Sequence, residues 1–459
     1  MNPAIFKAYD VRGLYPDQID EDAAWRIGNA TACYLWSKLQ GYDRGQAHSR
    51  AVVVGHDMRT HSPGLAKQLM DGITAAGADA VFIGMIDTPQ IYFAINHLGC
   101  CGGIQITASH NPAQYNGCKI SGQKAVPIGQ TTGLDDIKRI AMGEPQQVPA
   151  GEVGKMTEVD LARPYREHVL SFLASNTRKL KVVIDASNGM AGKWIPILYN
   201  EAGIEITMLN FEHDGTFVHD PNPLVESNLV QLKATIKEQG ADLGVCFDGD
   251  ADRLIVVDEQ GQTVSCDIMT ALLAQYFLRS HPGSMIVYDL RSSRIVKEEI
   301  ERLGGQARRE RVGHAFMKKT LKETNAVFGG ELSGHFYYRD NYYADSGMIT
   351  LAHLLNVMSE TNKSMSELVA PLRKYAVSGE MNFEVPDKQA MMSQLASKYK
   401  HGKADELDGI TIQFPDWWFN CRPSNTEPLL RLNVEAQDES NLQTRLGDLK
   451  ALLGEPVDH

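Results

Sequence analysis

The chain has 459 residues, and its 45 Lys and Arg against 57 Asp and Glu give a formal net charge of −12 at pH 7. This charge argues against a protein that holds nucleic acid or anionic membrane by bulk electrostatics, because both need a basic surface. Hydrophobic residues at 43% and charged residues at 22% are ordinary for a folded chain, which excludes the disordered and fibrous classes.

The sequence gives little sign of a membrane span, a signal region or a disulfide framework. No stretch approaches the roughly 18 apolar residues of a membrane span, and residues 1–15 contain no apolar signal region. The seven cysteines are scattered without a C-x-x-C motif, a pattern typical of reduced thiols and not of a disulfide framework or a zinc site. We therefore expect a cytoplasmic protein.

Short runs rich in Val and Ile recur along the chain and alternate with helical patterns such as Ser62–Ala76 and Val230–Gln239. This alternation predicts βαβ units and an α/β architecture with mostly parallel sheets. The predicted strands are Ala51–Gly55, Ala80–Gly84, Lys181–Asp185, Ile204–Leu209, Leu243–Phe247, Leu254–Asp258, Met285–Asp289 and Ala326–Gly329.

Breaks in this alternation divide the chain. A Pro- and Gly-rich segment, Gly143–Thr157, is typical of a linker. Further breaks are expected at Asp258–Gly261 and within residues 370–378, so four domains fit better than three. The first three could be structural repeats, since each holds a βα alternation.

The first candidate loop contains Ser109 and follows an apolar strand, Gly103–Ile106. Ligand sites in open α/β sheets lie where strands end, and His110 and Lys119 are candidate bases for a serine nucleophile. The alternative interpretation is a turn before Pro112 in which Ser109 caps a helix.

The second loop carries Asp248, Asp250 and Asp252, three carboxylates that suit Mg²⁺ or Ca²⁺. An EF-hand is rejected because Arg253 stands where the sharp turn requires Gly and the flanking residues are strand-like. An acidic surface turn is the alternative.

Two weaker loops follow. Glu331, Ser333 and His335, after a pair of glycines, could bind vicinal sugar hydroxyls, although a plain glycine turn fits equally. Arg422, in a turn of hydroxyl and amide residues with Arg431 beyond it, could bind phosphate, and a solvated arginine is the alternative.

Lesser features favour structural interpretations. Asp57, Arg59 and Ser62 are typical of a strand-to-helix junction in which Ser62 is the N-cap.

The combination of loops resembles the motif set of the α-D-phosphohexomutase family, in the same order and over nearly the whole chain, and within it the bacterial phosphomannomutase/phosphoglucomutase group. The motifs are FKAYDVRG (Phe6–Gly13), TASHNP (107–112), YNGCK (115–119), FDGDADR (247–253), GGELSGH (329–335) and RPSNTEP (422–428).

This resemblance implies four domains around a central cleft, of which the first three are α/β domains with mixed or parallel sheets. Domain I (1–154) would carry the phosphoserine loop, domain II (155–257) the metal loop and domain III (258–372) the sugar loop. Domain IV (373–459), a smaller α+β domain, would carry the phosphate-binding loop.

The resemblance also implies a mutase that interconverts mannose 1- and 6-phosphate, and glucose 1- and 6-phosphate, through a hexose 1,6-bisphosphate that also serves as activator. Ser109 would be the phosphoserine, and Mg²⁺ would be held by Ser109, Asp248, Asp250 and Asp252. The remaining catalytic residues would be Lys119, Arg12, His335 and His110. We expect neighbouring cations to lower the pKa of Lys119, because a lysine base must be neutral.

The substrate would be held by residues from all four domains. They would be Tyr9, Asn111, Arg253, Arg291, His314, Glu331, Ser333, Arg422, Ser424, Asn425, Thr426 and Arg431. Arg291 departs from the family pattern, since many relatives have a lysine there, and its planar fork could alter preference at the sugar C2.

Three other functions stay open at this point. A phosphoglucosamine mutase would act on the amino sugar, a metal-dependent serine phosphatase would release phosphate to water, and a non-catalytic sensor would only bind sugar phosphate. In every case we expect small-molecule sugar phosphates as partners, no nucleic acid or membrane, and a monomer or small homo-oligomer.

Overall fold

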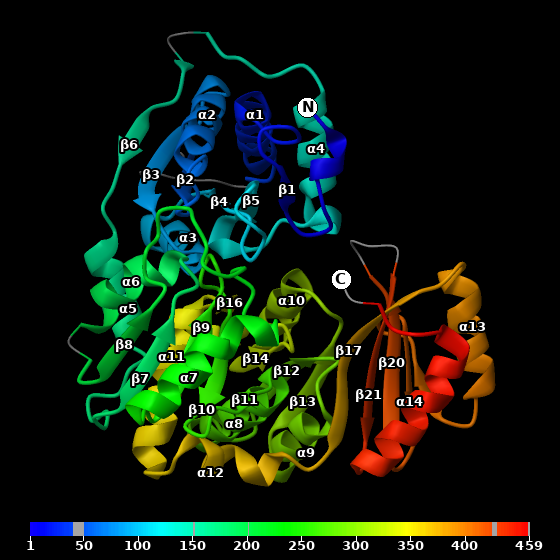
Figure 1. Cartoon of the computed structure of the whole chain (residues 1–459). Helices are drawn as coiled ribbons and strands as arrows, with labels where there is room; N and C mark the ends of the chain where they lie inside the picture. Colours follow the sequence, from blue (N-terminus) through cyan, green and yellow to red (C-terminus); the bar gives the residue numbers. More distant parts are fainter. Residues whose placement is uncertain (40–49, 150–151, 201, 425–428, 458–459) are drawn as a thin grey trace. The chain divides into compact units, whose positions relative to one another are not determined.

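The computed structural model describes residues 1–39, 50–149, 152–200, 202–424 and 429–457. They fall into two compact units, one of Met1–Ser265 with Ser333–Leu368 and one of Cys266–Leu332 with Val369–His459. Figure 1 shows the helices and strands of both. The predicted fold class is confirmed, because α/β domains with mixed or parallel sheets precede a smaller α+β domain. Within the described ranges no helix is both long enough and apolar enough to cross a bilayer.

The first sheet of the first unit has the order β1-β5-β4-β2-β3-β6, with bounds Val11–Leu14, Tyr115–Gly122, Gly102–Ile106, Ala51–His56, Asp79–Met85 and Met156–Glu158. Its helices are α1 (Glu21–Ser37), α2 (Ser62–Ala75), α3 (Thr88–Leu98) and α4 (Leu134–Met142). Strands β4, β2, β3 and β6 run parallel, whereas β1 and β5 pair antiparallel at one side. The sequence Ala-Val-Val-Val-Gly-His of β2 is buried throughout, as expected of a strand covered on both faces.

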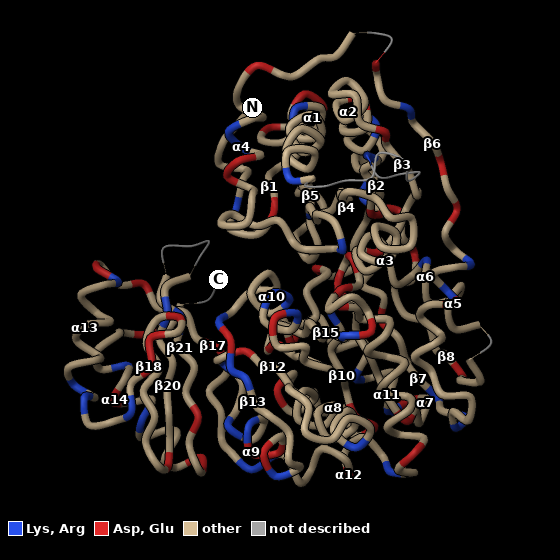
Figure 2. Tube along the Cα trace, turned by 180° about the vertical axis from the view of Figure 1, so that it is seen from behind, with Lys and Arg blue, Asp and Glu red and all other residues tan. Residues whose placement is uncertain are grey.

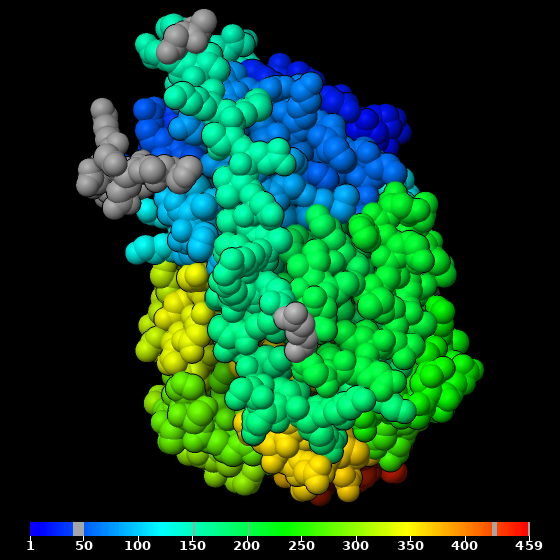
Figure 3. All heavy atoms as spheres, turned by 90° about the vertical axis from the view of Figure 1, so that its left-hand side faces the viewer, coloured from blue at the N-terminus to red at the C-terminus, as the bar shows by residue number. Residues whose placement is uncertain are grey.

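The second sheet of this unit has the order β11-β10-β9-β7-β8, with bounds Thr263–Val264, Leu254–Asp258, Leu243–Phe247, Lys181–Asp185 and Glu205–Leu209. Its helices are α5 (Ala162–Leu170), α6 (Met190–Tyr199), α7 (Val230–Gln239) and α11 (Gly347–Thr361), and the hairpin of β15 (Phe336–Tyr338) and β16 (Ala344–Asp345) belongs to the same unit. The segment that leads from β6 to α5 runs along the face shown in Figure 3.

The expectation of mostly parallel sheets is wrong for β9 and β10. These two strands pair antiparallel, with Phe247 opposite Leu254, because a six-residue connection is too short for a parallel crossover. Asp248, Asp250 and Asp252 therefore lie at the tip of a hairpin.

In the second unit, β12 (Met285–Asp289) pairs in parallel with β13 (Gln306–Glu310) and β14 (Phe328–Gly330). The helices of this part are α8 (Cys266–Ser280), α9 (Arg294–Arg302) and α10 (His314–Thr324). Acidic and basic residues are interspersed along the trace in Figure 2, for example along α9.

The C-terminal sheet of the second unit has the order β17-β21-β20-β19-β18, with bounds Ala376–Glu384, Leu429–Ala436, Trp417–Pro423, Ile410–Gln413 and Lys403–Asp405. Every pair in it is antiparallel. Helices α13 (Lys388–Lys398) and α14 (Glu439–Leu453) accompany it, and its core includes Trp417, Phe419 and Leu449.

Candidate active site

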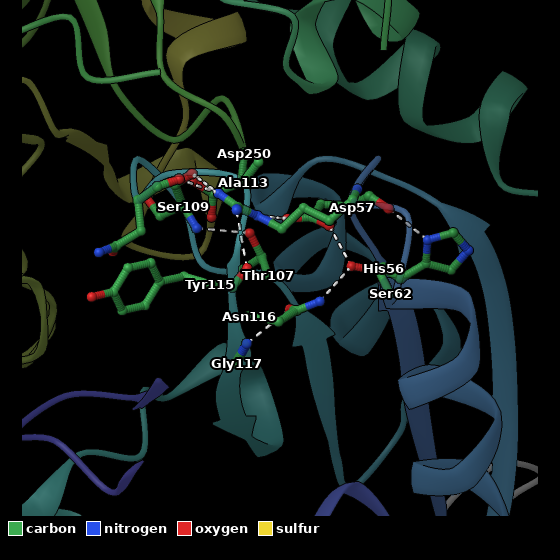
Figure 4. Close-up of polar contacts among 12 residues, drawn as sticks. His56, Asp57, Ser62, Thr107, Ser109, Ala113, Tyr115, Asn116, Gly117 and Asp250 are labelled. Carbon is green, nitrogen blue, oxygen red and sulfur yellow. Dashed lines mark hydrogen bonds and ion pairs between the residues drawn. The ribbon is translucent and has the colours of Figure 1, made fainter. Parts of the chain in front are cut away.

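Ser109 lies in the loop that follows β4, at the edge of the sheet where the parallel strands end. Its φ of 49° is in the left-handed region, which few residues other than glycine adopt without a cost. The Ser109 N–H donates to Thr107 Oγ1 at 2.9 Å, and the side chain is buried (Figure 4). The left-handed backbone and this hydrogen bond hold the main chain at Ser109 in place.

The Arg59 guanidinium holds this loop through its main-chain carbonyls. Its Nη2 donates to the carbonyls of Ser109 at 3.0 Å and Asn111 at 2.6 Å, and its Nη1 donates to those of Pro112 at 2.7 Å and Tyr115 at 3.0 Å. The Arg59 side chain is 1% exposed. Burial lowers the pKa of Arg59 from its ordinary value, against the opposing effect of the carboxylates beside it.

Asp57 orients Arg59 and also accepts a hydrogen bond from Ser62. Arg59 Nε donates to Asp57 Oδ2 at 3.1 Å, and Ser62 Oγ donates to Asp57 Oδ1 at 2.6 Å (Figure 4). The prediction that Ser62 is the N-cap is wrong, since it is the first residue of α2 and His61 occupies the cap position. Ser62 instead accepts from Asn116 Nδ2 at 2.9 Å, which links α2 to β5.

Asp248, Asp250 and Asp252 are all buried, and each offers a carboxylate oxygen within 4.8 Å of the others. Ser109 Oγ donates to Asp248 Oδ2 at 2.9 Å. A Cβ on Gly249 would lie 2.4 Å from the Ser109 carbonyl oxygen, so only glycine permits this approach of the two loops. The structure thus brings together the four residues predicted to hold a metal.

The carboxylates suit a divalent cation. Burial and the neighbouring charges of Asp252 and Asp250 raise the pKa of Asp248 well above its usual range. Asp250 Oδ1 is buried and has no hydrogen-bond partner among the described residues. A cation such as Mg²⁺, which prefers carboxylate and hydroxyl oxygens, would offset this repulsion and use the remaining oxygen.

Lys119 on β5 reaches the same carboxylates. Its Nζ donates to Asp250 Oδ2 at 2.7 Å and to Asp252 Oδ2. The expectation of a lowered pKa is wrong here: burial does disfavour the charge of Lys119, but Asp250, Asp252 and Asp248 outweigh burial and raise its pKa.

Thr88, the first residue of α3, is a site residue that the sequence analysis missed. Its N–H donates to the Asp250 carbonyl at 3.0 Å, and its Oγ1 donates to Asp250 Oδ2 at 2.5 Å. The helix start could be recognised from Asp87, which caps it through Gln90 N at 2.9 Å, but the distant Asp250 could not.

Both predicted histidines contact this group of residues. His110 Nδ1 is 3.3 Å from Ser109 Oγ, and burial together with Arg253, Arg12 and Lys119 lowers the pKa of His110 well below its usual range. His335 Nε2 is 3.3 Å from Asp252 Oδ1 and accepts from Arg253 Nε at 3.4 Å.

Four further predicted residues belong to the same unit. Arg12 on β1 donates to Asn111 Oδ1 and to Asp10, which orders the side chain of Asn111. Ser333 Oγ is 2.9 Å from His335 Nδ1, and Tyr9 lies half-buried in the bend before β1.

The other predicted residues belong to the second unit. Glu331 is buried and accepts from the Gly313 N–H at 2.9 Å, next to His314 at the start of α10. Arg291 follows β12 and donates from Nη2 to Asp289 Oδ2 at 2.6 Å. Arg422 and Arg431 face each other on β20 and β21. Ser424 is buried, and the predicted Asn425 and Thr426 lie outside the described residues.

Family models match the chain in four consecutive parts. They describe phosphoglucomutase/phosphomannomutase α/β/α domain I at residues 3–147, domain II at 163–261, domain III at 265–375 and the C-terminal domain at 380–449.

Individual relatives match over almost the whole chain. The phosphohexose mutases of Xanthomonas campestris pv. campestris (strain B100) are 39% identical, with 98% of each chain covered. The phosphomannomutase of Salmonella typhimurium is 37% identical, with 98% of this chain and 99% of the relative covered. A solved phosphoglucomutase/phosphomannomutase family protein from Burkholderia thailandensis has a TM-score of 0.89 and 32% identity, covering 100% of this chain and 99% of the other.

Proposed function

This chain belongs to the phosphoglucomutase/phosphomannomutase family of isomerases, and from that premise we propose that it interconverts hexose 1- and 6-phosphates through a phosphoserine at Ser109. The proposed substrates are mannose 1- and 6-phosphate, and glucose 1- and 6-phosphate as well. The observation that carries the proposal is the 2.9 Å contact between the Ser109 hydroxyl and Asp248 within a buried group of three carboxylates.

Phosphoryl transfer in this proposal proceeds in two halves. A hydroxyl of the hexose phosphate attacks phosphorus, the new O–P bond forms, and the bond to Ser109 Oγ breaks, which leaves a hexose 1,6-bisphosphate. The bisphosphate then reorients, and Ser109 Oγ attacks the phosphorus of the other phosphate. The O–P bond between that phosphorus and the sugar oxygen breaks, which restores the phosphoserine and releases the isomeric hexose monophosphate. The enzyme acts mainly by holding donor and acceptor in line and by stabilising charge.

Asp248, Asp250 and Asp252 would hold Mg²⁺ together with the Ser109 oxygen, and the bound ion would supply positive charge to the transferring group. Lys119 and Arg253 are already placed against these carboxylates. We assign proton transfer at the reacting oxygens to Lys119, with Arg12 and His335 nearby. His110, Asn111 and Arg253 would orient the phosphorylated serine.

The non-reacting end of the substrate would be bound by the residues of the second unit. Glu331 would accept hydrogen bonds from sugar hydroxyls, and Arg422, Ser424 and Arg431 would bind the other phosphate. Ser333 is proposed as a further sugar contact. His314 and Arg291 would complete the sugar contacts.

Intact mass is the direct test of the phosphoserine. An adduct of about 80 Da that maps to Ser109 and is lost when hexose 1-phosphate is added would support the proposal. A protein that turns over hexose 1-phosphate and never carries this adduct would refute it.

Comparative turnover separates the remaining functions. We expect isomer formation from mannose and glucose 1-phosphates. Activity confined to glucosamine 1-phosphate would instead identify a phosphoglucosamine mutase. Steady release of inorganic phosphate without isomer formation would identify a serine phosphatase.

A further inference from the structure

One carboxylate, Glu380 on β17, lies among three arginines of the second unit. Its Oε2 accepts from Arg422 Nη2 at 2.9 Å and from Arg291 Nη1 at 3.5 Å, and its Oε1 accepts from Arg431 Nη1 at 3.3 Å. Asn433 Nδ2 adds a fourth donor at 3.3 Å from Oε2. Donors from β20, β21 and the loop after β12 therefore converge on a single anionic group.

A bulge in β17 determines the direction of the Glu380 side chain. The register of β17 against β21 shifts between Val377 and Glu380, and Gly379 has a φ of 69°. A bulge of this kind turns a side chain in a new direction. The bulge is held in place by Ser378, whose Oγ accepts from the Val434 N–H at 3.0 Å.

Three arginines share two carboxylates here, Glu380 and the Asp289 that accepts from Arg291 Nη2 at 2.6 Å, so the cluster keeps an excess of positive charge. The side chains of Arg291 and Arg422 are 7% and 3% exposed, so water screens their charge poorly. The pKa of Glu380 falls to about 2, because Arg291, Arg422 and Arg431 outweigh the effect of its burial. Arg422 Nε is buried and has no hydrogen-bond partner within the described part of the chain.

A fan of guanidinium groups around two anionic oxygens is also how arginines bind phosphate. A carboxylate carries one negative charge, whereas a phosphate monoester carries about 1.5 to 2 at pH 7 and offers three oxygens. A phosphate can therefore displace the carboxylate and engage more donors than the carboxylate does.

We propose that Glu380 is an internal competitor, occupying the arginine cluster until the non-reacting phosphate of the substrate displaces it. This inference rests on the proposed function, which places that phosphate on Arg422 and Arg431. Glu380 lowers the affinity for every phosphate ligand and keeps the arginines together when no ligand is bound. It also prevents the bisphosphate from being held too tightly to reorient.

The test is the substitution Glu380→Gln, measured by the dissociation constant Kd for inorganic phosphate and by KM for mannose 1-phosphate. Removing the charge of the competitor should tighten binding, so that Kd and KM both fall about tenfold. This factor corresponds to the loss of one charge-assisted hydrogen bond. Glu406→Gln, which removes an exposed carboxylate from the same unit, is the matched control and should change neither constant.

The direction of the change decides between two roles. If Glu380 only orients the arginines, Glu380→Gln will weaken phosphate binding, and weaker or unchanged binding overturns the proposal. The variant leaves Arg422 and Arg431 without their anion and Arg291 with Asp289 alone. Its Tm should therefore fall, and added phosphate should raise that Tm more than it raises the Tm of the wild type. Equal responses to phosphate in the two proteins would also overturn the proposal.

The experiment separates this inference from the proposed function. Phosphate affinity is measured without turnover. If the wild type isomerises hexose phosphates and Glu380→Gln binds phosphate more weakly, only the internal competitor is refuted. If Glu380→Gln binds phosphate more tightly but the wild type isomerises no sugar phosphate, only the mutase activity is refuted. Glu380→Asp, which keeps the charge but withdraws it by one methylene, should give an intermediate affinity and guards against failure of the first variant to fold.

Discussion

Replacing Arg59 by methionine should destabilise the loop that carries Ser109 more than any exposed substitution. Four main-chain carbonyls lose the guanidinium at once, and of these the Pro112 carbonyl keeps the Tyr115 N–H as a donor at 3.1 Å. Each of the other three acceptors, left unpaired, costs roughly 1 kcal/mol or more, so the free energy of unfolding of the first unit should fall by about 3 kcal/mol. Asp57 retains donors in Ser62 and in the main chain of residue 59, which limits its share of the loss.

The measurement is urea unfolding followed by far-UV circular dichroism, with amide hydrogen exchange of residues 107–117 to locate the loss. Arg59→Lys keeps the charge but lacks the planar fork, so it should lose about half as much. Arg26→Met, at an arginine on α1 that pairs with Asp22, is the control and should stay within about 0.5 kcal/mol of the wild type.

Catalysis should suffer with stability in Arg59→Met. A displacement of the serine hydroxyl by about 1 Å lowers the rate by roughly 100-fold, so kcat should fall by about that factor even well below the unfolding transition. A loss of stability under about 1 kcal/mol, or a variant with normal kcat, would show that the carbonyls are rehydrated and that the loop holds its shape without the guanidinium.

Three other changes have definite expected outcomes. Ser109→Ala should abolish turnover while sugar-phosphate affinity, measured by calorimetry, stays within about threefold, since the arginines of the second unit remain; loss of that affinity in a folded variant would contradict the assignment. Gly249→Ala should lower kcat and stability, because its Cβ would meet the Ser109 carbonyl at 2.4 Å, whereas Gly447→Ala, in an open position of α14, should be neutral or stabilising by up to about 1 kcal/mol. Burial lowers the pKa of His353 to about 3, so the neutral form is favoured in the folded state. The contribution of His353 to the free energy of unfolding is therefore complete above about pH 6.5. It falls at lower pH as the unfolded chain takes up a proton, by about 2 kcal/mol at pH 5. His353→Gln should remove most of this pH dependence in urea unfolding, and an equal dependence in the variant would place its origin elsewhere.

The parts of the fold that follow from local patterns could be predicted. Apolar runs marked the strands, and Ser109 could be placed at a strand end because parallel strands end at one edge of a sheet. The direction of β10 could not be derived in this way, because an apolar run looks the same whether it pairs parallel or antiparallel.

The parts of the site that depend on the main chain or on distant partners escaped the sequence. Arg59 binds main-chain carbonyls, which every residue carries, so its contacts cannot be predicted from a pattern of side chains. Thr88 was unnoticed for a similar reason, since its partner Asp250 is 162 residues away. The pKa of Lys119 was expected to fall because its cationic neighbours could be named from the motifs, whereas its contacts with Asp250 and Asp252 appear only once the chain is folded.

The close approach of Gly249 to the Ser109 carbonyl has a consequence for chimeras between relatives. The serine loop and the acidic hairpin come from successive domains, and Gly249 O also accepts from the Met190 N–H at 2.9 Å. The main chains of the two loops therefore have to fit each other. A donor domain exchanged alone would bring a loop shaped for a different counterpart, so the first two domains should be transplanted as one block.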